Sequence, residues 1–406
     1  MARAICDTRD AVKVADSVFW IGVCDRETDK FEGMWDLPHG MAYNSYLIKA
    51  EKTVLIDTVK GAYMDGFFSR LNRLLDGLPL DYAVINHVEP DHSGALALLR
   101  RLYPEVKLVG NAKTAEMLKN FYGVEGGFVE VKEGGTLDLG GRRLVFVTVP
   151  MVHWPESMVS YDETNGILFS NDIFGGFGAV EGGIFDDEAD LNLVTEEMMR
   201  YYVNIVGRFS RQALKALEKV RKLNVSMICP AHGPIWRSCP GHVIDIYEKW
   251  SRQETEEGVV VVYGSMYGNT KTASDAIARS IAQAGVKPVR VYDASRSNMS
   301  FITTDVWKYR GLVLSCCTYN MEAFPPIAAL LRLLENKNMT GRRIGLCGTY
   351  SWASAALKEM QAFVERSKGG WKLVDPTIDI KSRPSCDDLE MCGQLGKNMA
   401  AAVRDI

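Results

Sequence analysis

The stretch NHVEPDHSGAL, residues 86–96, decides how the first half of the chain is interpreted. It brings four potential metal ligands into six positions: His87, Glu89, Asp91 and His92. The apolar segment DYAVIN (81–86) precedes it, and SGALALLRRL (93–102) has helical spacing, with Ser93 as the predicted N-cap. A loop directly after a strand presents its side chains at a sheet edge. This loop alone predicts either a metal site or a polar turn that caps the helix.

Three more potential ligands follow strand-like segments later in the chain: His153 in PMVHWPES, Asp172 after GILFS and His232 in CPAHGPIW. Each lies at a strand-to-loop boundary, where a side chain can reach an ion at the edge of a sheet. With these residues added, the pattern favours metal binding over a helix cap. His39 and His242 are more typical of structural or supporting positions, and Asp57 of a hydrogen-bonding residue behind the site.

The secondary-structure pattern changes at the polar segment SRQETEE (251–257), which predicts a linker between domains 1–254 and 255–406. The first part is strand-rich, with helices outside the strands. Its expected strands are 17–23, 43–48, 53–57, 81–86, 142–150, 158–162, 166–170 and 225–230, with a helical stretch over 194–223. In the second part, strands at 259–264, 287–293, 311–316, 342–348 and more weakly 371–378 alternate with helices. This alternation predicts a doubly wound parallel sheet.

Composition excludes several classes of protein. The chain has 406 residues, of which 47% are hydrophobic and 24% charged, as in ordinary globular proteins. A formal net charge of −4 argues against nucleic acid and anionic membranes as partners. No apolar run approaches the ~18 residues that cross a bilayer. Nine cysteines without a C-x-x-C pair, and a polar N-terminus, predict a cytoplasmic protein without disulfides or iron–sulfur clusters.

The second part also carries a loop suited to a phosphate group. SMYGNT (265–270) follows a strand and opens a helix, where free N–H groups and hydroxyls can hold a monophosphate; alternatively, Thr270 is simply an N-cap. Two more loops, CTYNMEAFPP (317–326) and GTYSWASAA (348–356), end neighbouring strands with aromatic side chains on which a flat ring could stack. These loops resemble the flavodoxin family, and the resemblance implies that they bind FMN. The implied FMN-binding residues are Ser265, Met266, Tyr267, Gly268, Asn269, Thr270, Thr318, Tyr319, Asn320, Gly348, Thr349, Tyr350, Ser351 and Trp352.

The ligand spacing of the first part resembles the metallo-β-lactamase superfamily, whose motif is H-x-H-x-D-H followed by distant His, Asp and His. Here Glu89 stands in place of the second histidine. The resemblance implies that His87, Glu89, His153 and Asp172 bind one ion, and that Asp91, His92, Asp172 and His232 bind the other. Asp172 would bridge the two ions. Replacing an imidazole by a carboxylate hardens the site and favours iron over zinc. Three carboxylates leave about one positive charge on two divalent ions, which a bridging hydroxide or oxo group would neutralise.

Together the two parts resemble the flavodiiron proteins (A-type flavoproteins), whose fold is an N-terminal αββα metallo-β-lactamase-like sandwich followed by a flavodoxin-like domain. The resemblance includes HWPESM, FSNDIFG and RYYVNI (200–205). It implies an oxidoreductase that reduces dioxygen to water, nitric oxide to nitrous oxide, or both, at a diiron site fed by FMN. Tyr202 and Asn204 are either near the site or plain packing residues. Glu32, where the family often has a histidine, and SWASAA, without the usual glycine and acid, are departures.

The same resemblance implies partners. An external electron donor is expected: rubredoxin, reduced deazaflavin or an NAD(P)H-linked reductase. The expected assembly is a head-to-tail homodimer, possibly a tetramer. Two such domains have radii of gyration of roughly 18 Å and 15 Å. Domains of this size would hold the metal site and the FMN of one chain far apart, so the FMN of one chain is expected to face the metal site of its partner. The alternatives are a dinuclear metallohydrolase with a fused flavodoxin module, and an electron carrier that uses only its FMN.

Overall fold

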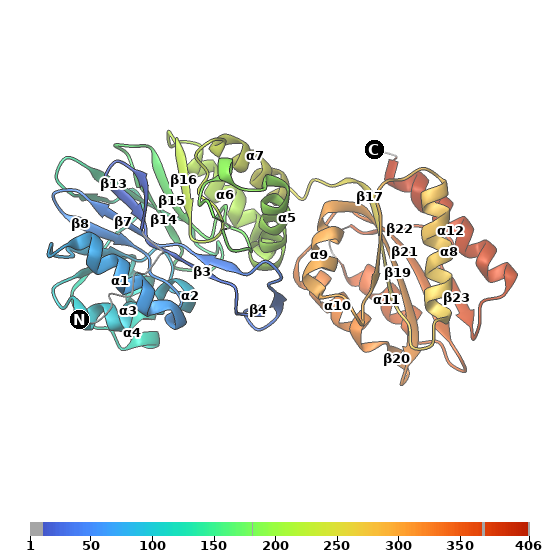
Figure 1. Cartoon of the computed structure of the whole chain (residues 1–406). Coiled ribbons are helices and arrows are strands. Elements are labelled where there is room, and N and C mark those ends of the chain that lie inside the picture. Colours follow the sequence, from blue (N-terminus) through green and yellow to red (C-terminus); the bar gives the residue numbers. More distant parts are fainter. Residues whose placement is uncertain (1–10, 181, 368–369, 405–406) are drawn as a thin grey trace. The chain divides into compact units, whose positions relative to one another are not determined.

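The computed structural model describes residues 11–180, 182–367 and 370–404, and the chain forms two compact units, Met1–Ser251 and Arg252–Ile406 (Figure 1). The division lies within the SRQETEE segment. Each unit has its own sheets and its own hydrophobic core. The described residues include no helix that is both long and apolar enough to cross a membrane.

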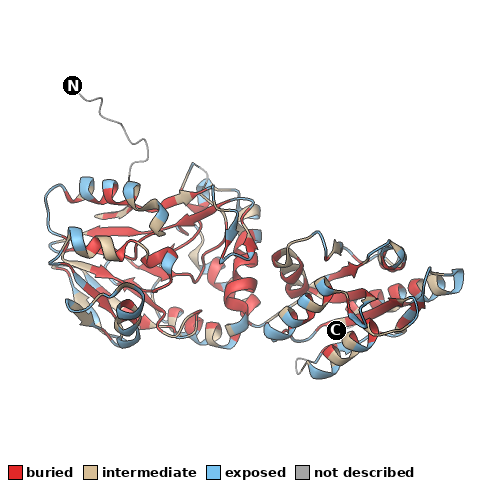
Figure 2. Ribbon diagram, turned by 90° about the horizontal axis from the view of Figure 1, so that it is seen from below, coloured by how far each residue is buried: buried red, intermediate tan, exposed pale blue. Residues whose placement is uncertain are grey.

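The first unit is a sandwich of two sheets. One sheet runs in the order β1 (Val12–Ala15), β2 (Val18–Trp20), β7 (Tyr46–Lys49), β8 (Thr53–Ile56), β9 (Tyr82–Val84), β10 (Lys107–Gly110) and β11 (Phe128–Glu130). The other runs β12 (Thr136–Asp138), β13 (Arg143–Thr148), β14 (Met158–Asp162), β15 (Ile167–Asn171) and β16 (Met227–Pro230). Strands β14 and β15 are buried along their whole length, and Figure 2 shows the sheets as mostly buried. Apolar side chains between the sheets form one core.

Helices cover both outer faces of this sandwich (Figure 1). The helices on one side are α1 (Met64–Leu75), α3 (Leu96–Leu102) and α4 (Ala112–Tyr122); those on the other are α5 (Leu191–Tyr201), α6 (Ser210–Val220) and α7 (Pro240–Ser251). Two small strand pairs lie outside the main sheets: β3 (Val23–Asp25) with β6 (Met41–Tyr43), and β4 (Lys30–Phe31) with β5 (Trp35–Asp36). The architecture is therefore the predicted αββα sandwich.

The predicted helix over 93–102 begins differently from the expectation. A short helix, α2 (Pro90–Ser93), comes first, and Ser93 ends it instead of capping the next helix. The Ser93 hydroxyl lies 2.5 Å from the carbonyl oxygen of Val88 and 2.9 Å from that of Glu89. Pro90 opens the turn, because its fixed φ suits a first helical position. The tight turn faces both Glu89 and Asp91 toward the sheet edge.

The helical stretch predicted over 194–223 is divided. Helix α5 passes into a π-helical turn (Tyr202–Val206) and a 3₁₀ turn (Gly207–Phe209) before α6 begins. The 3₁₀ turn begins at Gly207, directly after the π-helical turn. All six residues of RYYVNI are buried along this stretch.

The second unit is a parallel sheet in the order β18 (Val289–Asp293), β17 (Glu256–Gly264), β19 (Tyr309–Tyr319), β21 (Arg343–Tyr350) and β22 (Lys372–Leu373). A further strand, β23 (Ile378–Lys381), pairs with β21, and β20 (Glu322–Ala323) forms a hairpin with β19. The weak strand expected over 371–378 is thus two short strands, because Pro376 cannot donate a ladder hydrogen bond.

Five helices cover this sheet on both faces: α8 (Asn269–Gln283) and α12 (Cys386–Arg404) on one, α9 (Met299–Lys308), α10 (Pro325–Asn336) and α11 (Ala356–Arg366) on the other (Figure 1). The doubly wound parallel sheet was predicted from the strand–helix alternation, and this prediction is confirmed.

Candidate metal centre and flavin site

The seven predicted metal ligands meet in two groups at the edge of the sandwich. The first group is His87, Glu89, His153 and Asp172; the second is Asp91, His92 and His232. Within each group the potential ligand atoms all lie within 4.8 Å of one another. Asp172 and His232 follow the parallel neighbours β15 and β16, so both side chains emerge at the same edge.

Asp172 faces both groups. Its Oδ2 lies 3.5 Å from Nε2 of His87 and 3.3 Å from Nε2 of His153. Its Oδ1 lies 2.9 Å from Nε2 of His92 and 3.4 Å from Nε2 of His232. Each carboxylate oxygen thus serves one pair of histidines, which is the arrangement of a carboxylate that bridges two ions.

A carboxylate of its own completes each group. Glu89 Oε2 lies 2.9 Å from Nε2 of His153 and 3.2 Å from Nε2 of His87. Asp91 Oδ2 lies 3.4 Å from Nε2 of both His92 and His232. Separations near 3 Å are expected between neighbouring ligands that each lie about 2.1 Å from a shared ion.

The hydrogen bonding of these residues fits metal ions. Both carboxylate oxygens of Asp91 and Asp172 are buried without a hydrogen bond, as is Nε2 of His92 and of His232. Buried polar atoms without partners are rare in native proteins, because leaving them unpaired is costly. Three carboxylates in one buried cluster also require positive charge nearby. Two divalent ions would satisfy both requirements.

Two of the histidines are oriented by acceptors behind them. The Nδ1–H of His87 donates to Glu156 Oε1 at 2.6 Å, and the backbone N–H of Val88 donates to the same oxygen at 3.0 Å. The Nδ1–H of His232 donates to the carbonyl oxygen of Ala42 at 2.7 Å. Both bonds leave Nε2 with its lone pair toward the cluster. Sequence reasoning missed Glu156, although it stands in HWPESM, three residues after His153.

Asp57 lies behind the site. It accepts hydrogen bonds from the backbone N–H (2.8 Å) and Nδ2 (3.2 Å) of Asn86, the residue before His87. Burial raises the pKa of Asp57 to about 6. The side chains of His39 and His242 are exposed, and neither belongs to a ligand group.

The cluster is a strongly coupled set of charges when no metal is bound. Burial alone would lower the pKa of His153, but the neighbouring Asp172 and Glu89 raise it to about 9. The pKa of His232 rises to about 10 in the same way, through Asp172 and Asp91. Burial would raise the pKa of Asp172, but the surrounding histidines, His92 first, lower it well below its usual range.

Aromatic rings close the inner side of the second ligand group. The Tyr201 ring lies 5.3 Å from the His232 ring, and those of Tyr43 and Phe31 lie 5.8 and 5.9 Å from it. Tyr201, not Tyr202, is therefore the tyrosine of RYYVNI at the cluster. Tyr202 packs on Tyr247, 4.7 Å away between ring centres.

The Nδ2 of Asn204 donates to the carbonyl oxygen of Arg200, one turn earlier, at 2.8 Å. Both Tyr202 and Asn204 thus have packing and hydrogen-bonding roles in the fold.

A cavity of about 440 Å³ opens above Glu89 and Asp91, which are 8% and 9% exposed. Glu32 lines this cavity and accepts a hydrogen bond of 2.9 Å from Nε1 of Trp35. Lys60 lines it as well, 3.1 Å from Asp25 Oδ2. The metal cluster is therefore reachable from outside at its carboxylates.

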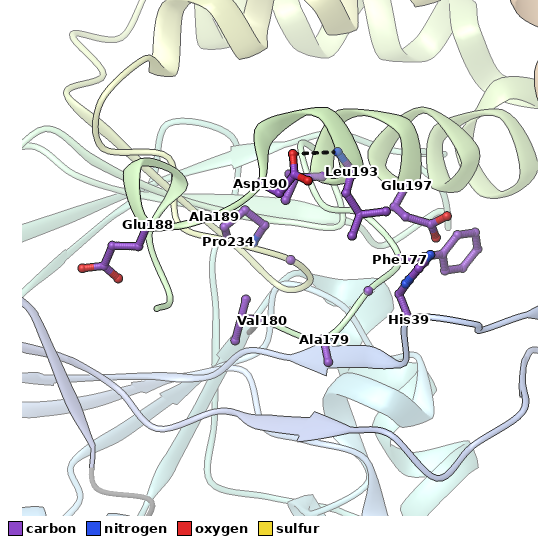
Figure 3. Close-up of a pocket in the computed structure, with 13 residues that line it drawn as sticks. His39, Phe177, Ala179, Val180, Glu188, Ala189, Asp190, Leu193, Glu197 and Pro234 are labelled. Atoms are coloured by element: carbon purple, nitrogen blue, oxygen red, sulfur yellow. Dashed lines mark hydrogen bonds between the residues drawn. The ribbon is translucent and has the colours of Figure 1, made fainter. Parts of the chain in front are cut away.

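A second cavity, of about 210 Å³, lies beside Phe177, whose ring is 5.1 Å from that of Tyr201 (Figure 3). Helix α5, the segment 177–180 and the Gly233–Pro234 turn form its walls. Gly233 follows the ligand His232 directly, so this cavity ends one residue from the metal cluster.

In the second unit, the three predicted flavin loops meet at the carboxyl ends of β17, β19 and β21. They line a cavity of about 70 Å³ that contains nine of the predicted residues: Ser265, Met266, Tyr267, Asn269, Thr270, Thr318, Thr349, Tyr350 and Ser351. Cys317 and Ser382 also line it, and sequence reasoning missed both. The hydroxyls of Thr270 and Thr349 lie 2.8 Å apart, so the first and third loops touch.

The other predicted flavin residues lie around this cavity. Gly268, at φ +92°, starts helix α8, and its N–H donates to the Ser265 hydroxyl at 3.0 Å. Gly348 is buried in β21, where a Cβ would lie 2.7 Å from Oδ1 of Asp379. A glycine is therefore needed at this position for close packing. Tyr319 and Trp352 are exposed, Trp352 at 87%; Asn320 belongs to the same exposed turn as Tyr319. A flat ring bound between these loops would cover that aromatic surface.

Known proteins share both halves of the chain. Residues 41–233 match the family described as ODP family beta lactamase, and residues 261–395 match flavodoxin. The chain is 34% identical over 396 residues to an anaerobic nitric oxide reductase flavorubredoxin of Escherichia coli O1:K1, covering 96% of this chain and 82% of the relative.

Solved structures agree along the whole length. The rubredoxin oxygen:oxidoreductase of Desulfovibrio gigas superposes with a TM-score of 0.93 at 28% identity, covering 97% of this chain and 99% of that one. The flavodiiron protein of Giardia intestinalis has the same TM-score and identity, covering 98% and 97%.

Proposed function

This chain belongs to the flavodiiron proteins, and from that premise we propose that it reduces dioxygen to water, nitric oxide to nitrous oxide, or both. One observation carries the proposal: each oxygen of Asp172 faces its own pair of histidines. With Glu89 in place of a histidine, the set offers hard oxygen ligands suited to iron. A zinc-dependent hydrolase would need neither this carboxylate nor three flavin loops in a second unit.

The cofactors are two iron ions, held by the seven ligands, and one FMN, held by the three loops of the second unit. When bound, two ferrous ions and a reduced FMN hold four electrons, which is the number that dioxygen needs to become two waters; coupling two nitric oxide molecules needs two.

The protein's own residues prepare the metal site. Glu156 and the Ala42 carbonyl keep the Nδ1 protons of His87 and His232, so both rings present Nε2 as a ligand. The rings of Phe31, Tyr43 and Tyr201 pack around His232, and Phe31 and Tyr43 also line the cavity above Glu89 and Asp91. This cavity leaves the carboxylates of the site accessible to a small ligand. Such a site is closed toward the core and open toward a small ligand.

We further propose that the protein acts in the cytoplasm with an external electron donor: rubredoxin, reduced deazaflavin or an NAD(P)H-linked reductase. A head-to-tail homodimer, possibly paired into a tetramer, would bring the FMN of one chain to the metal centre of the other. The exposed aromatic side chains around the flavin cavity support this proposal, because rings such as Tyr267 (91% exposed) and Trp352 suit an interface.

The test is stopped-flow oxidation of the fully reduced protein by dioxygen and by nitric oxide in parallel. We expect rapid reoxidation of FMN by at least one gas, in a yellow protein with about two irons per chain. Zinc without iron after growth with ample iron, or reoxidation by neither gas, would contradict the proposal.

A further inference from the structure

The second cavity (Figure 3) is lined by apolar side chains together with three carboxylates and the exposed His39. Each carboxylate already has a partner. Asp190 caps helix α5 by accepting from the N–H groups of Asn192 and Leu193. Glu197 pairs with Arg200 at 2.5 Å, and Glu188 with Arg237 at 3.3 Å. The lining also includes apolar side chains: Phe177, Val180, Leu193, Val194 and Pro234. A bound cation would have to compete for carboxylates that are in use.

The inner wall of this cavity leads to the metal cluster through stacked rings. The Phe177 ring lies 5.1 Å from that of Tyr201 and 5.6 Å from that of Phe31. Both of these rings lie against the ligand His232. Two layers of rings therefore separate the cavity from the metal site on this side, and the Arg200 guanidinium lies 4.4 Å from the centre of the Phe177 ring.

Two observations make the cavity suitable for a small uncharged molecule. Its volume of about 210 Å³ exceeds that of apolar cavities of about 150 Å³ that bind xenon or benzene. The apolar part of its lining, around Phe177, Leu193 and Val194, favours solutes that water hydrates poorly. Dioxygen and nitric oxide are both diatomic, uncharged and poorly hydrated.

Resting on the proposed function, we infer that this cavity binds the diatomic gas and admits it to the metal centre past Phe177 and Tyr201. In the proposed homodimer, the FMN-bearing unit of the partner is the electron carrier, and it would face the open side of the metal site, above Glu89 and Asp91. A carrier seated there would obstruct the larger cavity. A separate route from behind His232 lets gas arrive while the carrier is in place.

The first test locates a gas directly and does not depend on turnover. Crystals of the protein are pressurised with xenon, a probe of similar size and polarity. We expect a xenon atom among Phe177, Leu193 and Val194. Leu193→Trp should fill the cavity and remove this atom. Leu191→Trp is the matched control, because Leu191 lies on the same helix, is 41% exposed and does not line the cavity.

The second test measures the rate constant for reoxidation of the reduced protein at low gas concentration. Leu193→Trp should lower this constant about threefold or more, with iron and FMN contents and the rate at saturating gas unchanged. Leu193→Ala should keep the wild-type constant or raise it. Leu191→Trp should leave it unchanged.

The outcomes separate this inference from the proposed function. A wild-type cavity without xenon overturns the inference. If the wild-type protein consumes gas and Leu193→Trp reacts at the same rate, the inference is also overturned. Xenon binding that Leu193→Trp abolishes, together with the slower gas reaction, supports it. A wild-type protein that consumes neither gas overturns the function, and the inference with it.

Discussion

At the scale of single residues, Glu89 sets the chemical character of the metal site. It supplies the carboxylate of the first ligand group, 2.9 Å from His153 and 3.2 Å from His87. In Glu89→His the group would consist of three imidazoles and one shared carboxylate, a set that suits zinc better than iron.

We therefore expect Glu89→His, expressed with both metals available, to contain mainly zinc and to lose gas reduction. Metal analysis checks this result. Glu130→His, at an exposed position of β11, is the control and should keep its iron. An iron-loaded and active Glu89→His protein would show that ligand charge does not select the metal.

Glu156 is the residue that positions His87, and it touches no other member of the ligand set in the described structure. In Glu156→Gln the neutral amide accepts more weakly from Nδ1–H, so the imidazole becomes a poorer ligand. We expect metal affinity to fall about 10- to 100-fold. Competition with a chelator measures the affinity, and circular dichroism checks that the fold is unchanged. Unaltered affinity would mean that packing alone orients His87.

The metal-free protein should depend on pH in a direction that its histidines determine. The pKa of His153 is raised to about 9 and that of His232 to about 10, both above the unfolded value near 6.5. Their stabilising contribution is therefore complete below about pH 6.5 and is lost as the pH rises through 9 to 10.

Thermal unfolding of the chelated protein between pH 6 and 10 should show this falling midpoint temperature. The iron-loaded protein should show a flatter dependence, because metal ions replace the protons. Equal slopes for both forms would contradict the assignment of these histidines.

At the scale of elements, Arg200 fastens the β4–β5 hairpin to helix α5. Its Nη1 donates to the carbonyl oxygen of Asp36 at 2.9 Å, its Nη2 pairs with Glu197 at 2.5 Å, and its guanidinium lies 4.4 Å from the Phe177 ring centre. The hairpin carries Phe31 onto the ring of His232. Arg200 thus connects a buried ion pair with the wall of the metal site.

Arg200→Met should destabilise the protein by about 3–5 kcal/mol, because it leaves the buried Glu197 without its partner. The double variant Glu197→Gln/Arg200→Met should recover part of this loss. Denaturant midpoints at constant slope measure both. Arg221→Met, which breaks an exposed network with Asp245 and Glu248, is the matched control and should cost no more than about 1 kcal/mol. Equal losses for Arg200→Met and Arg221→Met would contradict the buried-pair account.

How well the sequence predicts a site residue depends on the separation along the chain between that residue and its contacts. The ligands could be predicted because each follows a strand, and strand ends converge at a sheet edge. Glu156 escaped prediction because its bond to His87 spans 69 residues, and Tyr201 because its ring meets that of His232 across the fold. The prediction that Ser93 caps a helix is wrong, because Ser93 is the last residue of the short helix α2. Local signals predict elements, but not side-chain partners across the fold.

At the scale of the whole molecule, the prediction concerns which FMN serves which metal centre. Two defective variants are combined: one without FMN, altered at Trp352 and in the 265–270 loop, and one without iron, altered at His87 and Asp172. If the FMN of one chain faces the metal centre of its partner, subunit exchange should restore one working junction per mixed dimer.

Gas consumption before and after mixing measures this recovery. Each variant mixed with itself is the control and should stay inactive. A lack of recovery although mixed dimers form, or full turnover by a verified monomer, would show that electrons stay within one chain.

The two units are joined by a single crossing of the chain near Ser251–Arg252, and this has a consequence for the cell. Translation delivers one flavin domain with every metal domain, so the ratio of the two cannot drift with gene expression or with separate degradation. A metal domain synthesised in excess would lack the flavin domain that supplies its electrons. Covalent fusion therefore keeps the two domains equal in number. A cell that makes more of this protein makes more of both domains together.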